Sequence, residues 1–197
     1  MAITAEMVKQ LREMTGAGMM ECKKALSETN GDLQKAVEEL RKSGIAKAEK
    51  RSERAASQGR VDCYIHDARI GVLIEVNCET DFVARTDDFV ALCRNLAMQA
   101  AAAGADYVRP EEVPADRIAK EKEIYAAQLA NEGKPAQMIE KILEGKIKKF
   151  YGEVCLLEQP YIKDDKKTVN ELVKEASAKT GENIVVRRFT RYRLGAE

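Results

Sequence analysis

Cysteine and histidine are among the residue types that could bind a metal ion or supply a nucleophile in this sequence. The chain contains five cysteines and one histidine, His66. Zinc sites usually use closely spaced cysteine pairs such as CxxC, and the sequence contains none. We therefore expect reduced thiols, no metal site and no cofactor. A thiol hydrolase that combines Cys63 or Cys78 with His66 stays open as an alternative, although a hydrogen-bonded surface histidine is the default interpretation.

A second stretch with distinctive chemistry is NCETDFVAR, residues 77–85. The preceding residues 70–76 alternate apolar side chains with others, which predicts a strand with one buried face. After the strand ends, the Thr80 hydroxyl can cap a helical turn, and Asp81 places a carboxylate at the positive end of that turn. Phe82 then either fills a corner of the core or projects, with Asp81, as a wedge into a partner.

The composition limits the classes of protein to which the chain could belong. Its 197 residues suit one domain or a compact body with a small satellite. The 33 basic residues are balanced by 33 acidic ones, whereas a dedicated nucleic-acid binder usually shows a basic excess. We therefore expect a protein partner and no direct contact with nucleic acid. No apolar run approaches the ~20 residues that cross a bilayer, so we expect a cytoplasmic protein without membrane association.

Three short helices are predicted within the first 45 residues. Apolar residues recur at helical spacing in residues 4–14, in residues 19–28, and from Asp32 to a stop before Gly44. Met14 and Met19 belong to the apolar faces of the first two helices. Helices this short are marginal in isolation, so we expect them to pack into one domain, residues 1–45.

Met19 and Met20 project about 100° apart on a helix, so both cannot easily face the same core. Methionines in a small helical domain usually fill gaps in its core, but one of this pair could be an exposed, adaptable contact. Arg12 and Lys23 are its charged neighbours.

The rest of the chain is predicted to form a basic helical connector, residues 46–59, and an α+β core, residues 60–197. The expected core elements are strands 60–66 and 70–76 in a hairpin, a long helix from Thr86 to Gly104, a helical hairpin 115–151 that turns around residues 132–134, a charged turn at 160–167, a helix from Thr168 to Gly181, and a strand 184–194.

The last strand interleaves arginines with Phe189 and Tyr192, which could form an RNA platform. The neutral charge of the chain favours instead a third strand of the sheet whose arginine stems lie across its face.

Three long motifs make the chain similar to the bacterial elongation factor Ts family of guanine-nucleotide exchange factors. They are LREMTGAGMMECKKAL (residues 11–26), IGVLIEVNCETDFVAR (70–85) and GKPAQMIEKILEGKIKKF (133–150). The resemblance implies an α+β fold: an N-terminal three-helix domain like the ubiquitin-associated (UBA) domain, then a core with a three-stranded antiparallel sheet, helices and a helical hairpin. It implies a binding protein that acts on elongation factor Tu and makes or breaks no bond. A ribosome- or RNA-associated protein without exchange activity is the alternative.

The resemblance also implies which residues bind elongation factor Tu. The family's N-terminal domain lies along a helix of the partner's G domain, and its TDFVA corner enters near the partner's Mg²⁺ and phosphate site. The expected contacts are Leu11, Arg12, Met19, Met20 and Lys23 in the first domain, His66 in the strand hairpin, and Thr80, Asp81, Phe82 and Val83 at the corner.

Longer members of the family contain two related core halves, whereas this chain has one sheet and one TDFVA corner. It therefore resembles the short form. By analogy, two copies would pair through the core and form a homodimer, giving a 2:2 complex with elongation factor Tu.

Overall fold

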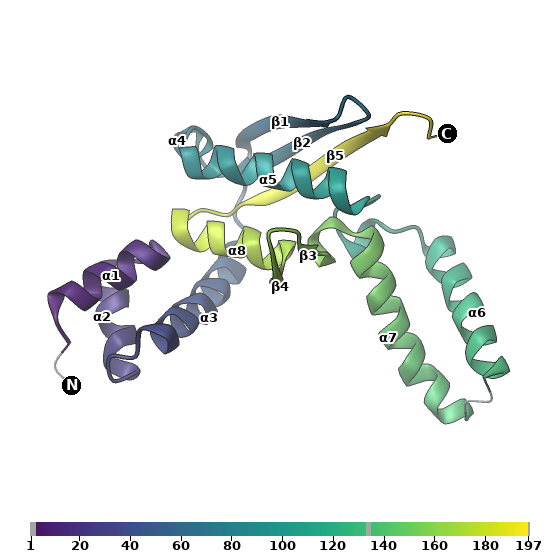
Figure 1. The fold of residues 1–197 in the computed structure, drawn as a ribbon, viewed down its shortest axis with the longest axis horizontal. Coiled ribbons are helices and arrows are strands. Elements are labelled where there is room, and N and C mark those ends of the chain that lie inside the picture. The colour runs from purple at the N-terminus through teal and green to yellow at the C-terminus, as the bar shows by residue number, and fades with distance from the viewer. Residues whose placement is uncertain (1–2, 133–134, 197) are drawn as a thin grey trace. The chain divides into compact units, whose positions relative to one another are not determined.

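A computed structural model describes residues 3–132 and 135–196, which fall into two compact units (Figure 1). The first unit consists of Met1–Arg60, Val76–Leu92 and Glu171–Val185, and the second of Val61–Glu75, Cys93–Asn170 and Val186–Glu197. Residues 133 and 134 of the predicted hairpin turn, and residues 1, 2 and 197 of the predicted terminal domains, lie outside the described residues. The domain ranges 1–45, 46–59 and 60–197 stay a prediction.

Helices contain most of the described residues. The α-helices are α1 (Ala5–Thr15), α2 (Met19–Glu28), α3 (Leu33–Arg51), α4 (Asp81–Ala84), α5 (Asp87–Ala103), α6 (Ala115–Asn131), α7 (Ala136–Val154) and α8 (Val169–Thr180). Two 3₁₀ turns, η1 (Pro110–Glu112) and η2 (Leu156–Glu158), flank the α6–α7 pair. The strands are β1 (Gln58–His66), β2 (Ile70–Cys78), β3 (Pro160–Tyr161), β4 (Asp164–Thr168) and β5 (Val185–Arg193).

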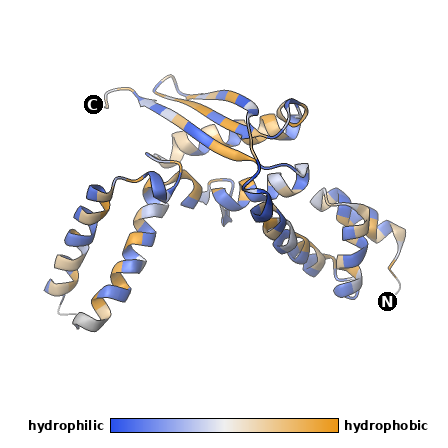
Figure 2. Cartoon of the chain, turned by 180° about the vertical axis from the view of Figure 1, so that it is seen from behind, coloured by the Kyte–Doolittle hydropathy of each residue, from blue (hydrophilic) through white to orange (hydrophobic). Residues whose placement is uncertain are grey.

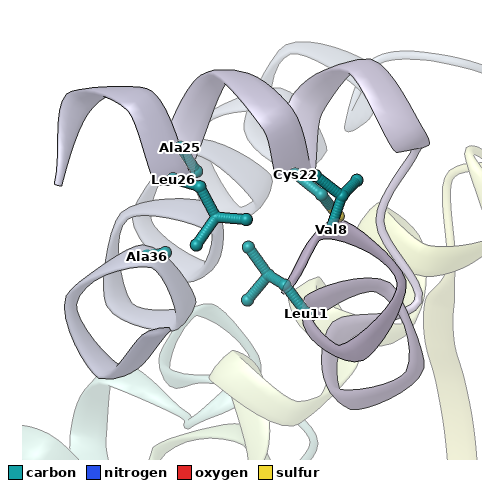
Figure 3. Close-up of a cluster of buried hydrophobic side chains, with 6 residues drawn as sticks. All are labelled: Val8, Leu11, Cys22, Ala25, Leu26 and Ala36. Carbon is teal, nitrogen blue, oxygen red and sulfur yellow. The ribbon is translucent and has the colours of Figure 1, made fainter. Parts of the chain in front are cut away.

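In the first unit, α1, α2 and the first part of α3 enclose a small apolar core. Six buried side chains form it: Val8, Leu11, Cys22, Ala25, Leu26 and Ala36 (Figure 3). Thr4 caps α1 by accepting a hydrogen bond from the Met7 amide, and Asp32 caps α3 in the same way through the Lys35 amide. The three predicted helices are therefore present.

The predicted end of the third helix before Gly44 is wrong, because α3 continues to Arg51. A Cβ atom at Gly44 would lie 3.0 Å from the Cβ of Ala178 on α8. The two helices also form an ion pair, in which Arg41 Nε lies 2.8 Å from Glu175 Oε1. The glycine therefore allows α3 to approach α8 closely and does not stop the helix.

The main sheet is antiparallel and three-stranded, as predicted, and its strand order is β1-β2-β5. Alternate residues of β2 are buried, which confirms the predicted buried face: Val72, Ile74, Val76 and Cys78. Helix α5 runs beside this sheet (Figure 1). In the second unit, Arg94 of α5 donates a hydrogen bond to the carbonyl of Cys63, and its guanidinium lies 5.3 Å from the centre of the Tyr64 ring.

The opposite face of the sheet carries exposed apolar side chains. Arg94 of α5 contacts Tyr64, so the neighbouring residues of β1 point away from that helix. The exposed apolar residues of the two strands are Val61, Cys63 and Ile65 on β1 and Leu73 on β2. We call these four residues the open sheet face.

Helices α6 and α7 form the predicted helical hairpin and lie side by side in Figure 1. Hydrophobic and hydrophilic residues alternate along both helices in Figure 2, as expected for a pair that buries one stripe of each helix. At the base of the hairpin, Phe150 packs with Val113, Val154 and Cys155. Among the described residues, no helix is both long and apolar enough to cross a bilayer.

The predicted charged turn at residues 160–167 is wrong, because this segment forms the two-stranded sheet β3–β4. The side-chain amide of Gln99 fixes it from α5. The amide nitrogen of Gln99 donates to the Pro160 carbonyl at 3.1 Å, and its oxygen accepts from the Ile162 amide at 2.9 Å. A buried side chain more than 60 residues away in sequence thus outweighs the low strand propensity of the four charged residues of β4.

Candidate partner-binding surfaces

Phe82 lies on α4, the single helical turn that follows β2. Among the described residues, no large hydrophobic side chain is more exposed than Phe82, at 79%. The next apolar residues of the turn are covered, since Val83 is half-buried and Ala84 is buried. The interpretation of Phe82 as a side chain that fills the core is therefore excluded, and the side chain is available to a partner.

The turn that carries Phe82 is capped as the sequence predicts. The Thr80 hydroxyl accepts a hydrogen bond from the Val83 amide at 3.4 Å. Asp81 lies in the first turn, where a carboxylate interacts favourably with the helix dipole. Its Oδ2 atom also accepts a hydrogen bond from Arg85 Nη2 at 2.6 Å. The corner thus presents an apolar ring beside a carboxylate that is already paired.

A second candidate surface lies at the junction of α1 and α2. Met19 and Met20 are both exposed, at 47% and 76%, and Arg12 and Lys23 are exposed as well. Met14, at the end of α1, is also exposed. We call these five residues the methionine surface. Helical spacing counts Met14 and Met19 with the apolar faces of α1 and α2, but both side chains lie outside the six-residue core.

Leu11, the remaining predicted contact of the first domain, is fully buried in the three-helix core (Figure 3). Its side chain lies between the helices and not on their outer surface. Leu11 therefore belongs to the core that holds α1 and α2 together, and its direct contact with a partner stays a prediction.

His66 is exposed at the end of β1 in the second unit. Its Nδ1 atom lies 3.2 Å from the Tyr64 hydroxyl, and its Nε2 atom 3.5 Å from the Asp67 carboxylate. These contacts match the default interpretation of a hydrogen-bonded surface histidine. The corner and the methionine surface both belong to the first unit.

The Cys78 thiol shows little of the character that a nucleophile needs. Cys78 is buried, and burial raises the pKa of its thiol, with a further contribution from the negative charge of Glu182. A neutral thiol is a poor nucleophile. The residues that the structure describes include no cluster of three His, Cys, Asp or Glu side chains that could hold a metal ion.

The arginines of β5 are partly neutralised within the second unit. Arg188 Nε lies 2.7 Å from Glu75 Oε2, and Arg191 Nη2 lies 3.9 Å from Asp106 Oδ1. An RNA platform would need these guanidinium groups for phosphate contacts, so the pairing favours the structural interpretation of the strand.

Sequence reasoning missed two residues that bear on these surfaces. Met14 was counted with the apolar face of its helix, because it lies three residues after Leu11 and so on nearly the same face. Glu182 bonds to the corner from 102 residues away, and no local pattern indicates such a contact.

Comparison with known proteins gives one consistent result. The family model described as "Elongation factor TS" matches residues 2–196. The Elongation factor Ts of Heliobacterium modesticaldum is 60% identical over 194 residues, which cover 98% of this chain and 90% of the relative. That of Moorella thermoacetica is 61% identical over 194 residues, with 98% and 96% covered. That of Coprothermobacter proteolyticus is 59% identical over 196 residues, with 99% and 100% covered.

Proposed function

Because the chain belongs to the elongation factor Ts family, we propose that it is a guanine-nucleotide exchange factor that binds elongation factor Tu in its GDP-bound form and promotes release of GDP. Such a reaction makes and breaks no bond. A factor that binds the nucleotide-free partner more tightly must weaken the partner's affinity for GDP by the same factor.

The observation that carries this proposal is the exposure of Phe82 on a capped turn. A large apolar side chain held in water gains free energy when a partner covers it. In the proposed mechanism Thr80 and Val83 shape the turn, while Asp81 and Phe82 enter between helices of the G domain near its Mg²⁺ and phosphate site. Mg²⁺ requires nearly octahedral geometry, so a small shift of those helices would loosen the ion and the phosphates that it bridges.

The wedge alone is too weak to account for exchange. Accelerating release by ~10⁴-fold requires a barrier lower by about 5.5 kcal/mol, whereas burying one Phe side chain supplies about 1.5–3 kcal/mol. We therefore propose that the methionine surface contributes the remainder by binding a helix of the G domain. Methionine side chains adapt well to such a surface, and Arg12 and Lys23 would add charge complementarity. We also propose that the three-helix bundle is UBA-like and that His66 contacts the partner.

We further propose that two copies pair through the open sheet face. The side chains of Ile65 and Leu73 are exposed there, and burying them against the same face of a second copy would remove apolar area from water. The expected assembly is a homodimer that binds two copies of elongation factor Tu in the cytoplasm, without direct contact with nucleic acid.

The test is stopped-flow release of a fluorescent GDP analogue from elongation factor Tu, with and without the protein. The wild-type chain should accelerate release strongly. Phe82→Ala should slow the stimulated release by roughly ten- to a hundredfold, because it removes the wedge and leaves its capped turn in place.

A matched control is Ile162→Ala, which removes an exposed apolar side chain from the β3–β4 turn. It should leave the release rate unchanged. Equal rates for wild type and Phe82→Ala would remove the wedge from the mechanism. Absence of any acceleration, together with binding to RNA that collapses with salt, would favour the alternative of an RNA-associated protein.

A further inference from the structure

The two backbone amides that connect β2 to α4 have left the sheet and need other partners. β2 ends at Cys78 and α4 begins at Asp81. The carboxylate of Glu182, which lies between α8 and β5, accepts both intervening amides. Its Oε2 atom lies 3.0 Å from the nitrogen of Glu79 and 3.0 Å from that of Thr80. One side chain thus satisfies both donors of the corner.

Glu182 also orients the hydroxyl group that caps α4. The Thr80 hydroxyl donates to Oε1 of Glu182 at 2.6 Å and accepts from the Val83 amide at 3.4 Å. Since its proton points to the carboxylate, an oxygen lone pair is left for the amide. Hydrogen bonds to an ionised carboxylate are stronger than those between neutral groups. The three hydrogen bonds to Glu182 therefore fix the orientation of α4 relative to the end of β2.

The next residue, Asn183, holds the segment that leaves α3. Its backbone amide donates to the Glu79 carboxylate at 2.7 Å. Its buried side-chain amide donates to the carbonyls of Ser52 and Arg54 at 3.2 and 2.8 Å. Glu182 and Asn183 are adjacent. Through them, the turn at residues 79–80 and the segment that follows α3 are both hydrogen-bonded to the same short stretch of chain.

We propose that Glu182 is a positioning residue for nucleotide exchange, because its bonds to Glu79 and Thr80 hold Phe82 in the orientation that enters the partner. This inference rests on the proposed function. A helix of only four residues is not stable alone. Without the carboxylate, the turn would sample several orientations, and ordering it again as Phe82 enters the bound partner would raise the barrier to GDP release.

The test begins with the maximal rate of GDP release at saturating concentration of the protein. Glu182→Ala should lower this rate about tenfold, while the concentration for half-maximal rate changes less than about threefold. Glu182→Gln keeps one carbonyl oxygen for the two amides but loses the charge, so its rate should be intermediate. The matched control Glu175→Ala removes a carboxylate of α8 that pairs with Arg41 and should leave the rate within about twofold.

Two further readouts separate positioning from a general loss of structure. In the Phe82→Ala background, Glu182→Ala should have little additional effect on the maximal rate, because both changes remove the same presented ring. Amide hydrogen exchange of residues 79–84 should become faster in Glu182→Ala and stay unchanged in Glu175→Ala, while both variants stay fully folded at the assay temperature by circular dichroism.

Other results would contradict the positioning role, the wedge or the proposed function. A normal maximal rate, unchanged amide protection at residues 79–84, or multiplicative effects of Glu182→Ala and Phe82→Ala would overturn the positioning role. If the wild-type chain does not accelerate GDP release, the proposed function itself fails, whatever the amide exchange shows. If the wild-type chain is active and Phe82→Ala is as fast, the wedge fails and the positioning role fails with it.

Discussion

Gly59 in β1 has no room for a side chain. A Cβ atom there would lie 2.2 Å from the carbonyl oxygen of Val76, and its φ of 144° is one that residues with a side chain rarely adopt. Gly59→Ala should therefore destabilise the protein by about 3 kcal/mol or more, which corresponds to roughly 6–12 °C in melting temperature. Gly71 in β2 has no atoms within 4 Å of the same position, so Gly71→Ala should cost far less. Similar melting temperatures for the two variants would contradict this account.

The ionisation of Cys155 should lower the free energy of unfolding at alkaline pH. Burial raises the pKa of Cys155 to about 11, from an ordinary value of 9.0, and neighbouring carboxylates, Glu158 first, add to the shift. Below pH 9 the thiol is protonated in both the folded and the unfolded chain. Between pH 9 and about 11 it ionises only when unfolded, so the free energy of unfolding should fall by about 1.4 kcal/mol per pH unit from this group.

Urea unfolding from pH 8 to pH 10.5 would measure this loss. Because tyrosines and lysines also titrate there, the quantity to compare is the difference between wild type and Cys155→Ala. The variant should be less stable at pH 8 and approach the wild type as the pH rises. A constant difference across this range would show that Cys155 ionises alike in both states.

Replacing a glycine within a helix changes the stability of the protein in a direction that depends on which atoms lie next to it. Gly145 in α7 has no atoms near the position of a Cβ, whereas Gly44 in α3 faces Ala178 at 3.0 Å. Gly145→Ala should stabilise the protein by up to about 1 kcal/mol through helix propensity. Gly44→Ala gains the same propensity but crowds α8, at a cost of about 1–3 kcal/mol, so its net effect should be destabilising. Thermal melts of the two variants should shift in opposite directions.

The helices were predictable where the sequence contains their end signals. Thr80 was identified as a cap because a side-chain oxygen at such a position accepts an amide hydrogen bond. Gly44 misled the prediction, because a glycine looks the same whether it ends a helix or allows another helix to approach. The β3–β4 sheet was missed because its fixing residue, Gln99, is remote in sequence.

The residues of the candidate surfaces could be singled out by their type, but the sequence did not show which of them are exposed. Phe82 was singled out because a ring follows an acid at a strand-to-helix corner, and only the structure shows that it is exposed. Helical spacing alone left open which of Met19 and Met20 is exposed, because the volume of a three-helix core determines how many side chains it can bury. In the structure both are exposed, and Leu11 lies in the core.

The proposed pairing of two copies can be tested by changing residues of the open sheet face. Analytical ultracentrifugation of the wild-type chain should give twice the mass of one chain. Ile65→Asp should shift the population to single chains, because burying an uncompensated carboxylate in an apolar interface should weaken association by at least about 100-fold, or ~3 kcal/mol. Ile162→Asp changes an exposed residue of the β3–β4 turn and should leave the mass unchanged.

Thiol labelling gives an independent check of this interface. Cys63 lies on the open sheet face and is exposed, whereas the other four cysteines are buried. Labelling of native protein should therefore modify Cys63 readily in Ile65→Asp and slowly in the wild type at concentrations that favour pairing. A single-chain mass for the wild type, or equally fast labelling in both, would exclude pairing through this face.

The two bonds from Asn183 to the chain that leaves α3 have a consequence for avidity. A flexible tether between two binding sites lowers the effective concentration of the second site once the first has bound. Here Ser52 and Arg54 are held beside the corner, so a partner seated on the methionine surface would meet Phe82 at a high effective concentration. Each contact could then be weak by itself, and the loss of either would speed dissociation.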